Sequence, residues 1–392
     1  MTTVIFYNFI LLGSTFFVWL SEKMRYKLDR WLFLGVAFFI VVAPAMLRYE
    51  IGVDYFSYKI IFENIRDGVD SFSQSSMEPG YYALNFIISS LELDFEWLIA
   101  VVALLIAIFF FMSYPSENKT IFHFVLWGVV YFDSFTYLRS ILAGSVLLYA
   151  VMQFYNNEKY LRFIFLVFLA ASFHKSAVLF LIIPLISLGR FYGLIIRAKY
   201  FLPLIILLVF LFAEKIVNLI FNNPVTSILG FSNYADSVYN REVELGSGLG
   251  VAAILVFLTY AIYIESRSLR ETKILTFIVF AATISLVLSA HVVIFERLLL
   301  LFIIAYPVAS YLVSQNKKIL LYKVSLSSIA LLFLYFIIMF NFNKAILSGS
   351  TDYTETCKGD RITPYVSVFN KEDSKRHPHL TRYQRWCEAH FK

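Results

Sequence analysis

The sequence predicts an all-α, polytopic integral membrane protein. Of its 392 residues, 60% are hydrophobic and only 15% are charged, and the mean hydropathy is +0.73. A soluble domain of this size has no way to bury so much apolar surface. The 42 Phe and 26 Tyr residues suit a lipid-facing surface with aromatic belts at its interfaces. These observations exclude an ordinary soluble enzyme.

About twelve apolar segments are expected to cross the membrane, since a helical span takes about 20 residues and the shorter segments extend into their flanks. The first is expected to be a span and not a cleavable signal, because it lacks a basic region and a small-residue cleavage site. The expected spans are 4–20, 31–47, 95–113, 120–135, 138–155, 160–173, 176–189, 200–213, 248–264, 274–290, 294–313 and 319–340.

Short basic loops predict the orientation of these spans. Lys and Arg cluster at 21–30, 155–162, 190–199, 265–273 and 315–318. The positive-inside rule places all of these loops in the cytoplasm. Both termini then lie outside, in the periplasm if the membrane is a bacterial inner membrane. The net charge of +6 is therefore a topology signal, and no nucleic-acid partner is predicted.

One apolar segment does not fit as a span. The segment 81–91 is too short, and counting it as a crossing would invert the basic loops on one side of it. We expect a re-entrant or interfacial half-helix there, and an interfacial amphipathic helix over 53–65. The predicted organisation is a membrane domain over 1–340, with outer loops 48–80 and 214–247, followed by an outer tail over 341–392.

The tail contains both cysteines of the chain, Cys357 and Cys387. Because oxidants are available outside the cytoplasm, we predict that the two form a disulfide, with two unrelated free thiols as the alternative. The tail also contains His377 and His379, which have no matched Cys or His set elsewhere. A solvated tail is favoured over a metal site.

Charged and imidazole groups interrupt or adjoin the apolar stretches at the same predicted outer face: Arg48, Arg139, His174 and the pair Glu296–Arg297. Charge at membrane depth is costly and usually faces a cavity or a partner, so one shared cavity is the natural hypothesis. Several arginines around one wet cavity indicate an anionic substrate, most simply a phosphate.

The first loop adds polar and aromatic candidates to this cavity. Asp54 can pair with Arg48 or bind sugar hydroxyls, and the aromatic rings of Tyr55, Tyr58 and Tyr81 can stack on sugars. Each feature has a plainer alternative. Arg48 can extend to lipid headgroups beside a tyrosine belt, and Glu78 can act as an ordinary carboxylate at a helix N-terminus.

The later candidates also have structural alternatives. Arg139 has no basic neighbours, which argues against a topology signal. His174, beside Lys175 in a polar hairpin, can act as a general base, donate to a phosphate or cap a helix. Glu296 and Arg297 can form a simple ion pair. The convergence of these residues supports the site more strongly than any one of them.

Taken in order, these motifs resemble the EpsG/Wzy group of bacterial polysaccharide polymerases. The resemblance covers most of 40–310 and is not expected to reach the cysteine-bearing tail. The motifs are Arg48-x3-Gly52-x-Asp54-Tyr55, Glu78-Pro-Gly-Tyr81, Tyr-Leu-Arg139-Ser, Ser-Phe-His174-Lys175-Ser-Ala and Glu296-Arg297. The His-Lys-Ser-Ala hairpin is the most specific of them.

The resemblance implies a GT-C-like fold and polymerisation of repeat units at the outer face of the inner membrane. The growing glycan would pass from undecaprenyl pyrophosphate to an incoming lipid-linked unit, without a metal or another cofactor. Besides the lipid-linked donor and acceptor and the bilayer, a chain-length regulator is a candidate partner.

Within this reaction, Arg48, Arg139 and Arg297 would hold the pyrophosphate and stabilise its departing charge, since no acidic doublet of the DxD type lies at the outer face. His174 is the first candidate for the base, with Asp54 or Glu296 second. The alternatives are a flippase of lipid-linked glycan, an O-antigen ligase and a membrane-bound acyltransferase.

Overall fold

The computed structural model describes residues 2–52, 54–69, 77–157, 159–187, 299–315, 326–348, 362 and 365–371, with scattered positions between 204 and 285. Throughout these residues the regular structure is helical, apart from one isolated antiparallel bridge between Arg48 and Ser367. Within the described part of the chain, four helices are long and apolar enough to cross a membrane: Thr3–Lys23, Lys27–Leu47, Phe95–Met112 and Leu138–Asn157. The prediction of an all-α membrane protein is confirmed at this level.

The chain divides into two compact units. Unit 1 comprises Met1–Phe111, Trp127–Leu142 and Met339–Lys392, and unit 2 comprises Met112–Leu126 and Ala143–Ile338. Several helices run from one unit into the other. The expected domain boundary at residue 340 falls within the last long helix, α19, which spans Leu326–Ser348.

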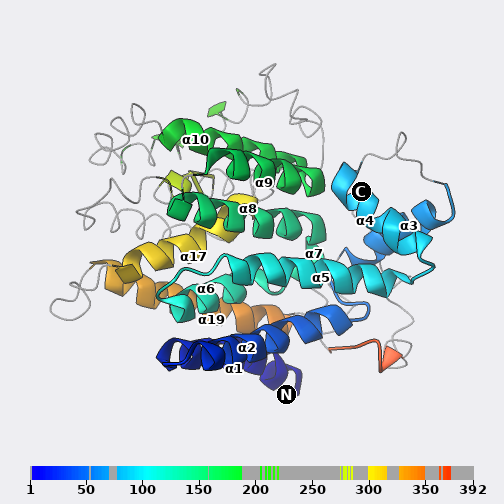
Figure 1. Ribbon diagram of the computed structural model, residues 1–392, viewed down its shortest axis with the longest axis horizontal. Coiled ribbons are helices and arrows are strands. Elements are labelled where there is room, and N and C mark those ends of the chain that lie inside the picture. The colour runs from blue at the N-terminus through cyan, green and yellow to red at the C-terminus, as the bar shows by residue number, and fades with distance from the viewer. Residues whose placement is uncertain are drawn as a thin grey trace. The chain divides into compact units, whose positions relative to one another are not determined.

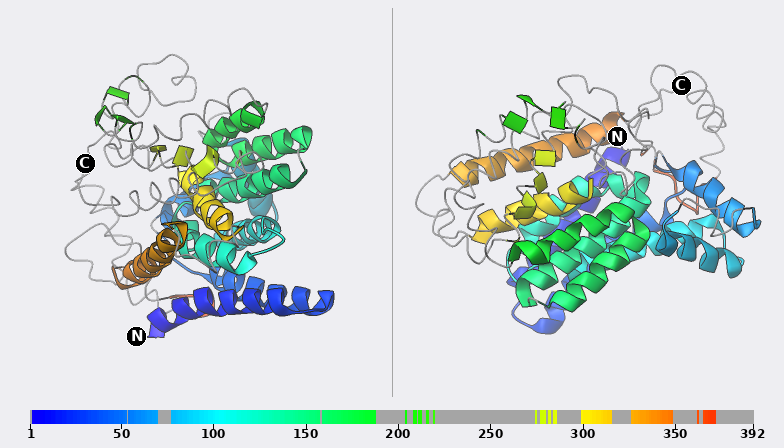
Figure 2. Two further views of the ribbon diagram at one scale, coloured as in Figure 1. Left: turned by 90° about the vertical axis from the view of Figure 1, so that its left-hand side faces the viewer. Right: turned by 90° about the horizontal axis from the view of Figure 1, so that it is seen from above.

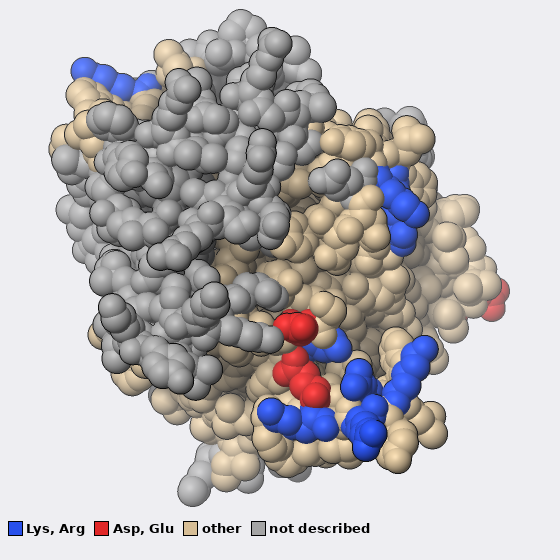
Figure 3. Space-filling view, turned by 60° about the vertical axis from the view of Figure 1, so that its left-hand side comes forward, with Lys and Arg blue, Asp and Glu red and all other residues tan. Residues whose placement is uncertain are grey.

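Unit 1 begins with a hairpin of two long helices, α1 (Thr2–Lys23) and α2 (Lys27–Leu47), which lie side by side (Figure 1). Three residues join them, and the turn carries exposed Lys23, Arg25 and Lys27. Figure 3 brings this side of the molecule forward and shows Lys and Arg side chains gathered on part of it, with Asp and Glu side chains next to them. The basic turn between two apolar helices is the pattern that predicted a cytoplasmic loop.

Two short helices follow α2, namely α3 (Tyr55–Arg66) and α4 (Pro79–Ser90), and they pack together (Figure 1). The amphipathic segment predicted at 53–65 is α3, whose buried residues Tyr55, Tyr58, Phe62 and Ile65 recur at helical spacing on one face. With 12 residues, α4 is about 18 Å long, too short for a hydrocarbon layer of about 30 Å. The structure thus confirms a half-length helix where the sequence predicted one.

The middle of the chain contains α5 (Phe95–Met112), α6 (Lys119–Val130), the single turn α7 (Asp133–Thr136) and α8 (Leu138–Asn157). The span expected at 120–135 is divided between α6 and α7. In unit 1, α7 brings Phe135 against the loop that follows α2. This contact is central to the site described below.

In unit 2, α9 (Tyr160–Phe173) has the bounds that the sequence predicted. The next expected span, 176–189, instead begins as a 3₁₀ helix, η1 (Lys175–Leu181), and continues as α10 (Ile182–Ser187). Pro184 contributes to this change because it has no amide hydrogen to offer the Phe180 carbonyl. Figure 2 shows α9 and α10 running beside each other.

Later in the chain the structure describes α17 (Leu299–Gln315) and α19. Residues 362 and 365–371 of the tail are also described, and Ile362 and Val366 are buried. Most of the expected outer loop 214–247 and the spans expected at 200–213, 248–264 and 274–290 lie outside the described residues.

Candidate functional site: an arginine and tyrosine cluster in unit 1

The loop from α2 to α3 is tightly packed around Gly52. The backbone of Gly52 has a φ of +109°, in a region that residues with a side chain rarely adopt. A Cβ at this position would overlap the carbonyl oxygen of Phe135. A glycine is therefore required on both steric and backbone grounds, and it lets the loop lie directly against α7.

Arg48 is the residue that immediately follows α2, and it is only 1% exposed. Its Nη1 donates to the Ala45 carbonyl at 2.7 Å, and its Cζ lies 4.7 Å from the centre of the Phe135 ring. Within the described part of the chain, Nε and Nη2 have no hydrogen-bond partner. A buried charge with open donors is uncommon and requires a physical explanation.

Tyrosine side chains supply much of the environment of this guanidinium. Burial lowers the pKa of Arg48 to about 10, and the nearby hydroxyls of Tyr55, Tyr131, Tyr365 and Tyr7 act in the opposite direction. Since this pKa is still well above neutral, Arg48 carries a positive charge under physiological conditions. The predicted alternative, an Arg that extends to lipid headgroups, does not fit a side chain enclosed by protein.

Arg139 lies in the first turn of α8 and is far more accessible. Its Nη1 donates to Oε2 of Glu78 at 2.7 Å, and the two side chains are 30% and 11% exposed. Glu78 directly precedes Pro79, the first residue of α4. The carboxylate thus faces an arginine from another helix in addition to lying at a helix N-terminus. This pair joins the beginning of α8 to the beginning of α4.

Two tyrosines complete the surroundings of Arg139. Its Cζ lies 5.9 Å from the centre of the Tyr81 ring. The centres of the Tyr81 and Tyr58 rings are 5.8 Å apart, and the angle between the ring planes is 62°. The Tyr58 side chain also interacts electrostatically with Arg139. Burial raises the pKa of Tyr58, Arg139 opposes that rise, and the half-buried carboxylate of Asp54 adds to it.

Electrostatics link the two arginines through Tyr81. Burial raises the pKa of the Tyr81 hydroxyl, while the charges of Arg139 and Arg48 both lower it. Both positive charges therefore act on one hydroxyl. The structure brings together the candidates of unit 1: Arg48, Asp54, Tyr55, Tyr58, Glu78, Tyr81 and Arg139.

His174 and Lys175 belong to unit 2, where His174 ends α9 and precedes η1. The His174 amide donates to the Ala170 carbonyl, and its own carbonyl accepts from the Ala177 amide. The side chain of His174 is partly exposed, and Lys175 is exposed. The expected convergence of His174 with the arginines stays a prediction.

Four predicted residues lie outside the described part of the chain: Glu296, Arg297, Cys357 and Cys387. Their assigned roles, including the disulfide, stay predictions.

Sequence reasoning missed a contribution of the tail to this cluster. The Tyr365 hydroxyl donates to the Pro44 carbonyl at 3.0 Å, and Lys371 Nζ lies 3.3 Å from Oε1 of Glu96. The local signal was the apolar run Tyr365–Phe369 within an otherwise hydrophilic tail. Such a run indicates burial, but it does not indicate the surface against which the segment packs.

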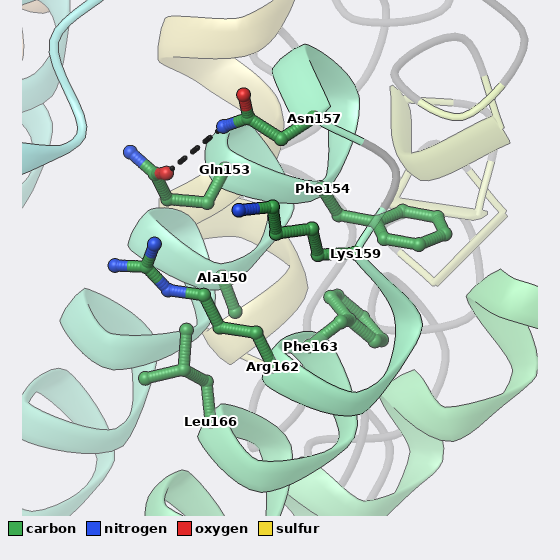
Figure 4. A pocket seen from close by; sticks show the side chains of 8 residues that line it. All are labelled: Ala150, Gln153, Phe154, Asn157, Lys159, Arg162, Phe163 and Leu166. Carbon is green, nitrogen blue, oxygen red and sulfur yellow. Dashed lines mark hydrogen bonds between the residues drawn. The ribbon is translucent and has the colours of Figure 1, made fainter.

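A separate small pocket lies in unit 2 between the end of α8 and the beginning of α9 (Figure 4). The polar ends of Gln153, Lys159 and Arg162 lie on one side, and the rings of Phe154 and Phe163 lie on the other. Lys159 precedes α9 and Arg162 lies in its first turn. Both come from the basic segment 155–162, which the positive-inside rule predicts to be cytoplasmic. The pocket is at the opposite end of α9 from His174.

The apolar helices and the charged cluster at their ends define a helical membrane protein with a polar site next to its spans. The chain belongs to the EpsG family, whose family model matches residues 31–366. Membership is consistent with a polysaccharide polymerase of the EpsG/Wzy type. No curated protein and no solved structure matches the chain.

The family match is wider than the series of motifs that first indicated it. It begins before residue 40 and continues to residue 366, so it includes Cys357 and Tyr365 but neither Lys371 nor Cys387. The expectation that the resemblance stops before the tail is therefore wrong for the first part of that tail.

Proposed function

We propose that this protein polymerises repeat units carried on undecaprenyl pyrophosphate at the outer face of the bacterial inner membrane. The growing glycan leaves its lipid pyrophosphate and joins the incoming lipid-linked unit. Membership of the EpsG family supports the polymerase reaction in general. The site assignment rests on Arg139, whose partly exposed side chain is paired with Glu78 and lies near Tyr58 and Tyr81.

Arg139 is the pyrophosphate contact in this proposal. A guanidinium has five N–H donors in a rigid fork that matches phosphate oxygens. One nitrogen of Arg139 is bonded to Glu78, and its Nε has no hydrogen-bond partner within the described residues. The Arg139 side chain is 30% exposed, so we assign its exposed donors to the anion, and Glu78 holds the fork in place.

Arg48 assists through its electrostatic effect on the Tyr81 hydroxyl. Because its side chain is enclosed, it contributes through its positive charge. A charge in a low-dielectric interior acts more strongly over a given distance than one in water. Arg297 is assigned to the same pyrophosphate from a part of the chain that lies outside the described residues.

In the chemical step, a hydroxyl oxygen of the acceptor sugar attacks the anomeric carbon of the growing glycan. The bond from that carbon to the pyrophosphate oxygen breaks, and the electron pair leaves with the pyrophosphate. The hydroxyl proton passes to His174, with Asp54 or Glu296 as the second candidate base. The arginines stabilise the negative charge that develops on the leaving group, so no metal is required.

Purified protein tests this proposal when it is supplied with a defined undecaprenyl-pyrophosphate-linked repeat unit and a metal chelator. A ladder of lengthening glycans is the expected result, whereas unextended substrate would contradict the polymerase function. In cells, loss of the polymerase leaves lipid capped with a single unit. Loss of a flippase leaves no capped lipid, and loss of a ligase leaves polymer unattached to the core, so the pattern separates these alternatives.

A further inference from the structure

The C-terminal end of α2 is capped largely by residues from the far end of the chain. The last four carbonyl groups of a helix have no donor within that helix. Three of them accept hydrogen bonds from outside α2: Pro44 from Tyr365 Oη at 3.0 Å, Ala45 from Arg48 Nη1 at 2.7 Å, and Leu47 from the Val368 amide at 2.9 Å. Two of these three donors therefore belong to the tail.

The same tail segment continues along the backbone next to the helix end. Arg48 and Ser367 form an antiparallel bridge, and the Tyr49 amide donates to the Val366 carbonyl at 2.9 Å. Further along, Lys371 Nζ lies 3.3 Å from Glu96 and 4.9 Å from the centre of the Tyr49 ring. Residues 365–371 thus contact the end of α2, the residues that follow it and Glu96.

The tail also closes the surroundings of the Arg48 side chain. The centre of the Tyr365 ring lies 4.7 Å from the centre of the Phe6 ring and 6.1 Å from the centre of the Tyr7 ring. Its hydroxyl is among those that interact electrostatically with Arg48. The Tyr7 hydroxyl in turn donates to the Ile362 carbonyl at 2.8 Å, which secures the chain just before the segment.

We propose that residues 365–371 are a positioning segment for Arg48 and that Tyr365 is its principal residue. This inference rests on the proposed function, because the polymerase reaction is what Arg48 is held in place to support. The carbonyl end of a helix carries partial negative charge and attracts a guanidinium. The tail occupies the Pro44 and Leu47 carbonyls, so Arg48 is left with Ala45 and the face of Phe135.

Without the tail donors, the same guanidinium has a competing arrangement. Arg48 Nε and Nη2 lack partners within the described residues, and the vacated carbonyls of Pro44 and Leu47 would attract them. An unbonded buried carbonyl and an unbonded buried donor are both costly, so the side chain would turn toward its own helix end. Its charge would then leave the position that it now holds against the Phe135 ring.

Tyr365→Phe tests this proposal in the full-length protein, because it removes only the hydroxyl and leaves the ring on Phe6. One hydrogen bond contributes about 0.5–1.5 kcal/mol, so polymerisation should slow about two- to tenfold. The amount of membrane-inserted protein and its thermal midpoint in detergent should change little. Phe369→Ala is the matched control, because this residue of the same segment is 83% exposed and should keep the full rate.

A double-mutant cycle with Arg48→Lys distinguishes positioning from a general structural role. Lysine keeps the charge but lacks the planar fork that the tail holds in place. If Tyr365 acts through Arg48, the rate loss from Tyr365→Phe should shrink to less than about twofold in the Arg48→Lys background. Equal losses in both backgrounds would show that Tyr365 acts elsewhere and would overturn the proposal.

Failure of this inference can be told apart from failure of the proposed function. Tyr365→Phe at full rate, together with an inactive Arg48→Ala, would overturn the positioning segment and leave the polymerase site standing. A fully active Arg48→Ala would instead remove Arg48 from the proposed site. Absence of a ladder from the unaltered protein would overturn the polymerase function itself.

Discussion

Arg139 and Glu78 form an ion pair at 2.7 Å between the first turn of α8 and the residue that precedes α4. The two residues lie 61 positions apart in the chain, and the Arg139 guanidinium lies 5.9 Å from the centre of the Tyr81 ring. A carboxylate in this position fixes the direction of the guanidinium, while the Arg139 side chain is still 30% exposed. This geometry is why Arg139 is the central residue of the proposed site.

Replacing Arg139 by Ala should lower the polymerisation rate by about 10²–10³, the loss expected when a donor to developing negative charge is removed. The measurement is the rate of ladder formation by purified protein with a lipid-linked repeat unit. Protein of normal abundance and normal activity would contradict the assigned role.

Arg66→Ala provides the control for that substitution. Arg66 also pairs with a carboxylate, Asp67, but both side chains are largely exposed, at 43% and 59%. Exposed ion pairs contribute little, so this variant should retain both its rate and its stability.

Gly52→Ala should destabilise the protein, because the added methyl group meets the Phe135 carbonyl and the backbone has a positive φ. We expect a clear drop in the thermal midpoint in detergent and less folded protein in the membrane. Gly35→Ala is the matched control, since nothing lies within 4 Å of its added methyl group. Within α2 that change should be neutral or slightly stabilising, as alanine is the better helix former. Similar behaviour of the two variants would contradict the close packing of the loop.

His174→Ala should slow polymerisation about 10²–10⁴-fold if the imidazole accepts the acceptor proton. The protein should remain folded, because the His174 side chain is partly exposed. His123 is a useful contrast, because it is fully buried and hydrogen-bonded to Tyr114. Substitution of His123 should mainly reduce the amount of folded protein. Normal ladders from His174→Ala would leave His174 with a structural role only.

Cys357 and Cys387 should form a disulfide if the tail lies outside the cytoplasm. The test compares the mobility of untreated and reduced protein on a gel, together with the labelling of thiols before reduction. Replacement of either cysteine by Ser should abolish the mobility difference. Alkylation of both thiols in untreated protein would contradict the disulfide and weaken the predicted topology.

The sequence predicted those features that depend on local pattern. The bounds of α9 and the half-length of α4 followed from runs of apolar residues, and an amphipathic helix was predicted over 53–65, where the structure has α3. Hydropathy and periodicity are properties of neighbouring residues, so they can be read without knowing the fold. The η1 segment differs from its prediction, because hydropathy does not distinguish a 3₁₀ turn from an α-helix.

By itself, the sequence determined that this is a helical membrane protein with arginines, carboxylates and tyrosines at the ends of its spans. Only the tertiary structure decided that Arg139 is open and paired with Glu78 while Arg48 is enclosed. It also decided that the tail caps α2, through a contact between Tyr365 and Pro44 that joins residues 321 positions apart. Burial and pairing depend on which distant segments meet, and a local pattern of residues carries no such information.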